Sequence, residues 1–79
     1  MMKIEKLINA EMEATSNVII SGGRSSKENM RILDETLIRL KSIVIGAEVS
    51  GGICENKAYS YRDSISDWYY DLQAIIESR

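Results

Sequence analysis

The chain contains no proline, phenylalanine or histidine, and its 79 residues include a single cysteine, Cys54. One cysteine excludes a disulfide within the chain. Without histidine or a second cysteine, the ligand sets of zinc and iron–sulfur sites are also missing. Histidine is the side chain best suited to proton transfer near neutral pH. These absences argue against an enzyme and against a resident metal or cofactor.

Long apolar runs are absent as well. The strongly apolar runs span four residues or fewer, as at residues 43–45, whereas a membrane-spanning helix needs about 20. Near the N-terminus, Glu5, Glu11 and Glu13 occupy positions where a secretory signal carries an uncharged apolar stretch. We therefore expect a cytoplasmic protein without a membrane segment, in a reducing compartment that suits a lone thiol.

The overall composition is that of one folded domain covering residues 1–79, with 44% hydrophobic and 28% charged residues. A domain of this size buries only about 60% of the surface that its unfolded chain exposes, so its core supplies little surplus stability. With no disulfide or metal, the expected supplement is self-association or binding to another protein. A net charge of −2 gives no general attraction to a phosphate backbone, so nucleic acid is a disfavoured partner.

Apolar residues recur at spacings of three and four, which is the period of a helix and predicts an all-α domain of three helices. The first predicted helix covers about residues 3–20. It ends at Gly22 and Gly23, because glycine readily adopts the left-handed conformation that closes a helix. The alternative for the last residues of this helix is an extended conformation, which the β-branched run at residues 17–21 favours.

The second predicted helix covers about residues 26–48, since Ser25 and Glu28 match a capping box. The third covers about residues 60–77, and residues 53–59 are the predicted connector. The second and third helices should form an antiparallel helical hairpin, with the first helix packed across the second.

The second helix has more apolar surface than one neighbouring helix can cover. Ile32 and Ile43 lie on one side of its central apolar seam, and Ile38 and Ile45 lie on the other. We therefore expect a homodimer or higher oligomer whose interface uses Ile32, Ile38, Ile43 or Ile45. The seam itself consists of Met30, Leu33, Leu37, Leu40 and Val44.

The aromatic side chains all lie in one stretch of the chain. Helical phase predicts that Tyr61, Trp68 and Tyr69 fill the core. Tyr70 points to another side of the third helix, and Tyr59 lies in the predicted connector. Tyr59 and Tyr70 are therefore the aromatic candidates for contact with a partner.

The turn between the first two helices is the candidate site for a small anion. Small residues let a backbone approach an anion, the start of a helix offers free N–H groups, and Arg24 and Lys27 add positive charge. The segment does not match the phosphate-loop pattern GxxxxGK[ST], and no predicted strand leads into it. The same residue types also build an ordinary helix–helix turn. The candidate residues are Gly22, Gly23, Arg24, Ser25, Ser26 and Lys27.

Glu11 falls within the apolar stripe of the first helix. A buried carboxylate there needs a partner or a proton, and Arg24 or Arg62 is the predicted partner. A catalytic role is disfavoured because no second titratable group accompanies it.

Asp63, Asp67 and Asp71 recur every four residues along the third helix. They form either a solvated acidic face or a ridge for a cation or a basic partner, and repulsion between like charges favours the solvated face. Cys54 is either a small apolar side chain or a free thiol, and no activating base is identifiable for it.

The leading prediction is a non-enzymatic protein-interaction module, a small regulator, inhibitor or assembly component of bacterial or phage type. It follows from the missing catalytic and metal-binding groups together with the excess of apolar helix surface and the aromatic cluster. The alternative is a phosphate or nucleotide binder that uses residues 22–27. A nucleic-acid-binding regulator ranks third, since the second and third helices lack a dense Lys/Arg face.

Overall fold

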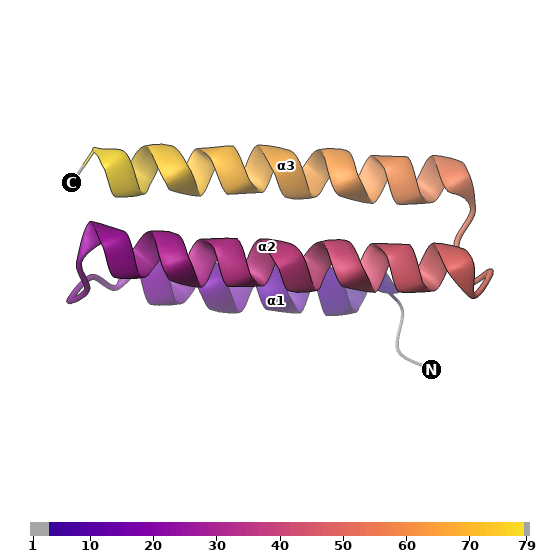
Figure 1. Ribbon diagram of the computed structural model, residues 1–79, viewed down its shortest axis with the longest axis horizontal. Coiled ribbons are helices and arrows are strands. Elements are labelled where there is room, and N and C mark those ends of the chain that lie inside the picture. The colour runs from indigo at the N-terminus through magenta and orange to yellow at the C-terminus, as the bar shows by residue number, and fades with distance from the viewer. Residues whose placement is uncertain (1–3, 79) are drawn as a thin grey trace.

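The computed structural model, which describes residues 4–78, consists of three α-helices (Figure 1). They are α1 (Ile4–Ile20), α2 (Ser26–Val49) and α3 (Glu55–Glu77). α2 and α3 lie antiparallel and side by side, and α1 lies behind α2 in the view of Figure 1. Each helix contacts the other two. The predicted all-α, three-helix architecture with an antiparallel hairpin is therefore confirmed.

α1 stays helical through Ile20, so the β-branched run at its end does not become extended. Ile19 in this run is fully buried, and packing of an apolar face outweighs a modest local preference. The chain then reverses at Gly22 and Gly23, whose φ angles are 81° and 82°. Glycine adopts this left-handed conformation without steric penalty, as the sequence predicts.

α2 begins where the capping pattern predicts. Ser25 is in an extended conformation, and its hydroxyl oxygen accepts a hydrogen bond from the Glu28 backbone N–H at 3.1 Å. The helix ends at Val49, one residue beyond the predicted end. Gly51, with φ of 80°, closes the turn by donating its backbone N–H to the Glu48 carbonyl at 3.1 Å.

The predicted start of the third helix is wrong, because most of the predicted connector is helical. α3 begins at Glu55 after Cys54, an N-cap residue whose side chain makes no capping hydrogen bond. The usual Ser, Thr, Asp or Asn signal for a helix start is therefore missing. Ala58 is fully buried in this first turn and holds it against the core. Tyr59 consequently lies on a helix and not in a connector.

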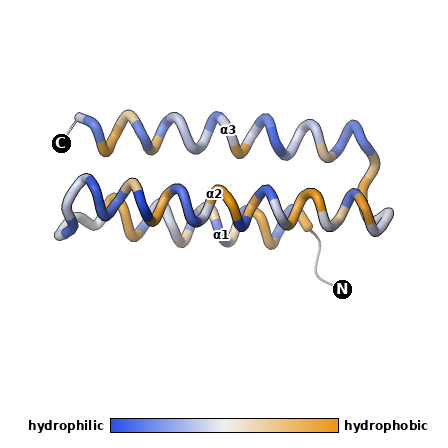
Figure 2. The backbone as a smooth tube through the Cα atoms, in the orientation of Figure 1, coloured by the Kyte–Doolittle hydropathy of each residue, from blue (hydrophilic) through white to orange (hydrophobic). Residues whose placement is uncertain are grey.

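The core consists of two clusters, one toward each end of the bundle, and the half-buried Trp68 packs against both. The apolar residues that build them recur along each helix between hydrophilic ones (Figure 2). Full burial of a Leu, Ile or Val side chain contributes about 1.5–3 kcal/mol. Within residues 4–78, no helix has both the length and the apolar character to cross a membrane. The buried members are Ile8, Leu40, Val44, Ala58 and Ile65 in one cluster and Ile19, Leu33, Leu72 and Ile76 in the other.

Candidate functional site

Several large apolar side chains are exposed on the α2–α3 hairpin. The exposed fractions are 66% for Ile38, 52% for Ile45, 82% for Val49, 69% for Tyr59 and 64% for Tyr70. These five residues lie outside the two core clusters. Because apolar surface in water is unfavourable, a grouped set of such side chains is a candidate interaction surface. We call these five residues the hairpin face.

On α2, the three aliphatic members of the hairpin face form one stripe. A helix turns by about 100° per residue, so Ile38, Ile45 and Val49 fall within an arc of about 40°. Thr36 and Leu40, which are fully buried, point to the opposite side of the helix. α2 therefore presents one apolar stripe to the core and a second to solvent.

On α3, Tyr59 and Tyr70 also share a flank, within about 20° of each other and roughly 16 Å apart along the axis. Tyr70 is held by Tyr69, since the two ring centroids are 5.5 Å apart and the ring planes meet at 81°. Such an edge-to-face arrangement stabilises aromatic pairs. Tyr69 is held in turn by Asp34 on α2, to whose carboxylate the Tyr69 hydroxyl donates at 2.7 Å.

Contacts between helices show that the two tyrosines point away from α1. Trp68 reaches α1, where its indole N–H donates to the Ser16 hydroxyl at 2.8 Å. Tyr69 and Arg62 lie further round α3 and reach α2. Tyr59 and Tyr70 come next round α3 in the same direction. These tyrosines are therefore on the side of α3 opposite to α1.

The residues round α2 follow a similar order, from those that contact α1 to those that are exposed. Thr36 and Arg39 reach α1, and Asp34 reaches α3. The stripe of Ile38 and Ile45 comes next round the helix beyond Asp34. The aliphatic and aromatic parts of the hairpin face thus lie on one side of the molecule, the side that Figure 1 turns to the viewer with α1 behind.

Polar contacts lie between the two stripes. Besides the Tyr69–Asp34 bond, Arg62 Nη1 donates to Glu48 Oε1 at 3.2 Å. The hydrogen bond to Asp34 raises the pKa of the Tyr69 phenol above its ordinary value of 10.0, and burial and the charge of this carboxylate act in the same direction. At neutral pH the phenol is therefore protonated and serves as a donor. These contacts hold α2 and α3 in register and leave polar groups accessible between the stripes.

A shallow groove of about 740 Å³ extends the hairpin face along the first half of α2. Met30 and Ile38 contribute apolar atoms to its lining. Arg31 and Glu35 contribute charge and form an ion pair with each other at 3.1 Å. The groove offers a partner both apolar contact and hydrogen-bonding groups.

The four isoleucines that are candidates for an interface differ in exposure. Ile38 and Ile45 are exposed on the hairpin face, whereas Ile32 and Ile43 are half-buried. Ile43 packs against the core cluster. Val49 is not among the predicted interface residues, because the predicted helix ended at residue 48. Val49 lies four residues after Ile45, so continuing the helix by one turn places it on the same side.

The residues predicted to bind an anion lie together in the turn between α1 and α2. Gly22 and Gly23 reverse the chain, and Ser25 caps α2. Arg24 Nη1 donates to the Val18 carbonyl at 3.4 Å, near the end of α1. These four residues have roles in the fold, while Ser26 and Lys27 are exposed at the start of α2.

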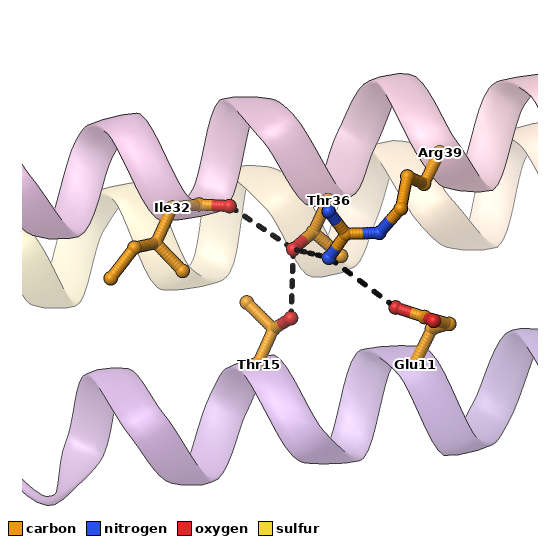
Figure 3. Close-up of polar contacts among 5 residues, drawn as sticks. All are labelled: Glu11, Thr15, Ile32, Thr36 and Arg39. Atoms are coloured by element: carbon orange, nitrogen blue, oxygen red, sulfur yellow. Dashed lines mark hydrogen bonds and ion pairs between the residues drawn. The ribbon is translucent and has the colours of Figure 1, made fainter.

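A buried polar cluster links α1 to α2 (Figure 3). The Thr36 hydroxyl oxygen lies 2.8 Å from the Thr15 hydroxyl, 3.0 Å from the Ile32 carbonyl oxygen and 3.1 Å from Arg39 Nη2. A hydroxyl has one proton and two lone pairs. Since the carbonyl can only accept, the Thr36 proton goes to it, and Thr15 must donate to Thr36 as Arg39 does. All hydrogen-bonding capacity of Thr36 is used, so the cluster is a structural link.

The predicted partner of Glu11 is wrong. Its Oε2 atom lies 3.5 Å from Arg39 Nη2 (Figure 3), whereas Arg24 turns back to the end of α1 and Arg62 pairs with Glu48. The register between α1 and α2 decides the pairing, and sequence spacing does not reveal it. The Glu11 side chain is 33% exposed, so its charge keeps contact with water.

Asp63, Asp67 and Asp71 are all exposed along α3. Among residues 4–78, no group of three acidic or cysteine side chains is placed to hold a metal ion. Cys54 is exposed at the start of α3. These acidic residues and the thiol are therefore separate surface features.

Comparison with protein-family models gives no match, and comparisons with curated proteins and with solved structures give none either.

Proposed function

We propose that this chain is a non-enzymatic protein-interaction module, acting as a small regulator, inhibitor or assembly component, and that the hairpin face is its binding surface. The observation that carries this proposal is the gathering of five large exposed apolar side chains on one side of the hairpin. Within residues 4–78, neither core cluster includes them. Aromatic and aliphatic side chains of this kind dominate the binding energy of protein interfaces.

The shape of the hairpin face supports binding of a helix. Its aliphatic and aromatic stripes follow two antiparallel helices, whose axes in packed pairs lie about 8–10 Å apart. A partner helix laid between such stripes places apolar side chains at spacings of three, four and seven residues against both. The Tyr69–Asp34 and Arg62–Glu48 contacts lie between the stripes and offer polar groups that favour a matching partner.

Affinity capture with matched variants tests this proposal. Ile45→Ser and Tyr70→Ala remove parts of the hairpin face, and Ile20→Ser on α1 is the control, since Ile20 is 54% exposed and Ile45 is 52% exposed. We expect the first two variants to lose the proteins that the wild-type chain captures from its source cell, and the control to retain them. The proposal is wrong if all three variants capture the same proteins as the wild type, with folding verified by circular dichroism.

A further inference from the structure

We propose that a cleft between α1 and α3 binds one free α-amino acid, whose ammonium group pairs with Glu5 and whose carboxylate pairs with Lys57. This site shares no residue with the hairpin face, so it goes beyond the proposed function. Three features carry the inference: a cavity of small-molecule size, polar side chains in it that have no partner within residues 4–78, and two opposite charges at one level of the bundle.

The cleft has a volume of about 190 Å³ and is more enclosed than the groove along α2. Drug-sized ligands occupy about 300–1,000 Å³. At about 30 Å³ for each water molecule, the cleft holds about six waters, or one small metabolite in their place. The buried Ile8 and the half-buried Met12 and Tyr61 form its apolar part. The lining residues are Glu5, Ile8, Asn9 and Met12 on α1 and Lys57, Ser60, Tyr61 and Ser64 on α3.

The polar side chains of the cleft differ from those that bridge α1 to another helix elsewhere. Trp68 donates to Ser16 at 2.8 Å, and Arg39 pairs with Glu11 at 3.5 Å. In the cleft, no polar lining side chain forms a hydrogen bond or ion pair with another residue in the range 4–78. An ammonium group, a carboxylate, an amide and three hydroxyls are therefore available to a ligand.

The two charged residues of the cleft lie at the same level of the bundle. α1 and α3 both run antiparallel to α2, so they are parallel to each other (Figure 1). The bond between Ser16 and Trp68 sets an offset of 52 residues between the two helices. The same offset places Glu5 opposite Lys57, and both line the cleft. Among the ion pairs of residues 4–78, none joins these two side chains.

Opposite charges on the two walls determine the class of ligand. A carboxylate binds an ammonium group, and an ammonium group binds a carboxylate. A free α-amino acid carries both groups on one carbon atom, so it can satisfy Glu5 and Lys57 together. A ligand with a single charge leaves one of the two without a partner, which disfavours it. The apolar surface of Ile8 and Met12 suits a small aliphatic side chain, such as that of valine.

Nuclear magnetic resonance of backbone amides tests the inference by titration with alanine, valine, leucine or methionine, each up to about 10 mM. We expect at least one of them to shift the resonances of residues 5–12 and 57–64 in a saturable way. The N-acetyl and amide derivatives of that amino acid, which each lack one charge, should bind at least about tenfold more weakly. The inference is overturned if no amino acid gives a saturable shift in these two segments, or if the derivatives bind as tightly as the free amino acid.

Two variants test the pairing of charges, each with a matched control. Glu5→Gln and Lys57→Met remove one charge each at exposed positions, so the fold should persist, as circular dichroism checks. Each should raise the dissociation constant by about tenfold. Glu13→Gln and Lys6→Met remove the same charges from exposed positions of α1 outside the cleft, and should leave the constant unchanged. Equal effects of cleft and control variants contradict the pairing, because net charge would then explain the change.

Discussion

The two sides of α2 differ in an unexpected way: polar side chains are buried toward α1, and apolar side chains are exposed on the hairpin face. The buried Thr36 hydroxyl makes three hydrogen bonds, so its burial leaves no polar capacity unused. Ile38 and Ile45 are exposed and belong to neither core cluster. The buried Thr36 is therefore explained by the fold of one chain, while the exposed isoleucines are the basis for the partner that we propose.

The largest expected effect is a difference in the free energy of unfolding between substitutions on the two sides of α2. Leu40→Ala on the inner side should lower the free energy of unfolding by about 2–5 kcal/mol, because it leaves a cavity in the core. That is a large share of the roughly 4–12 kcal/mol expected for a domain of this length. Ile45→Ala on the outer side should stay within about 0.5 kcal/mol of the wild type at a concentration where the chain is monomeric. Urea denaturation measures both, and similar losses from the two substitutions would remove the distinction between the sides.

A smaller effect is expected from the polar cluster. Thr36→Val keeps the shape of the side chain but leaves the buried Thr15 hydroxyl without its acceptor, which should cost about 1–3 kcal/mol. Replacing both residues, as Thr15→Val with Thr36→Val, should recover most of that loss because no unpaired hydroxyl remains. A double-mutant cycle by urea denaturation measures the coupling between them. Strict additivity of the two single substitutions would contradict a direct hydrogen bond.

Gly46→Ala should have a still smaller effect on a single chain, and one of opposite sign. Alanine is favoured over glycine in a helix interior by about 1 kcal/mol, and the space for its methyl group is open. Thermal unfolding at a concentration where the chain is monomeric should therefore show a higher midpoint. A lower midpoint would mean that the single chain itself requires glycine at this position.

The smallest expected effect is the loss of stability as the Tyr69 phenol ionises at high pH. The folded-state pKa of Tyr69 is raised by its hydrogen bond to Asp34, so folding favours the protonated phenol. The resulting stability is fully present below the unfolded-state pKa near 10.0 and is lost as pH rises through the higher folded-state value. Asp34→Asn should move the Tyr69 titration back toward its ordinary value, and Tyr69→Phe should remove it. Absorbance titration of tyrosinate measures this, and an unchanged titration in Asp34→Asn would exclude the carboxylate as the cause.

The sequence predicted most of the fold, because apolar period, the Ser25 cap and the glycine turns are local signals. The start of α3 was missed, since Cys54 provides no side-chain cap and burial of Ala58, a tertiary contact, secures that turn. The pairing of Glu11 was missed for a similar reason: it depends on the register between α1 and α2. Local patterns do not contain such information.

For the candidate site, helical phase placed Ile38, Ile45 and Tyr70 away from the core-facing seams, and all three are exposed. It did not show that they share one face with Tyr59, because that depends on how α3 is rotated against α2. Sequence alone does not separate Ile32 and Ile43 from the other two isoleucines. Their half-burial follows from their place on the other side of α2's apolar seam. The sequence thus yields faces of single helices, and packing decides which faces combine.

The most direct test of the hairpin face as the binding surface is nuclear magnetic resonance of backbone amides as the protein concentration is raised. We predict that the chemical shifts change along the outer sides of α2 and α3 and that α1 is unaffected. The changes should centre on Ile38, Ile45, Val49, Tyr59 and Tyr70. Changes centred on α1, or the absence of any change up to near-millimolar concentration and on addition of a captured partner, would contradict it.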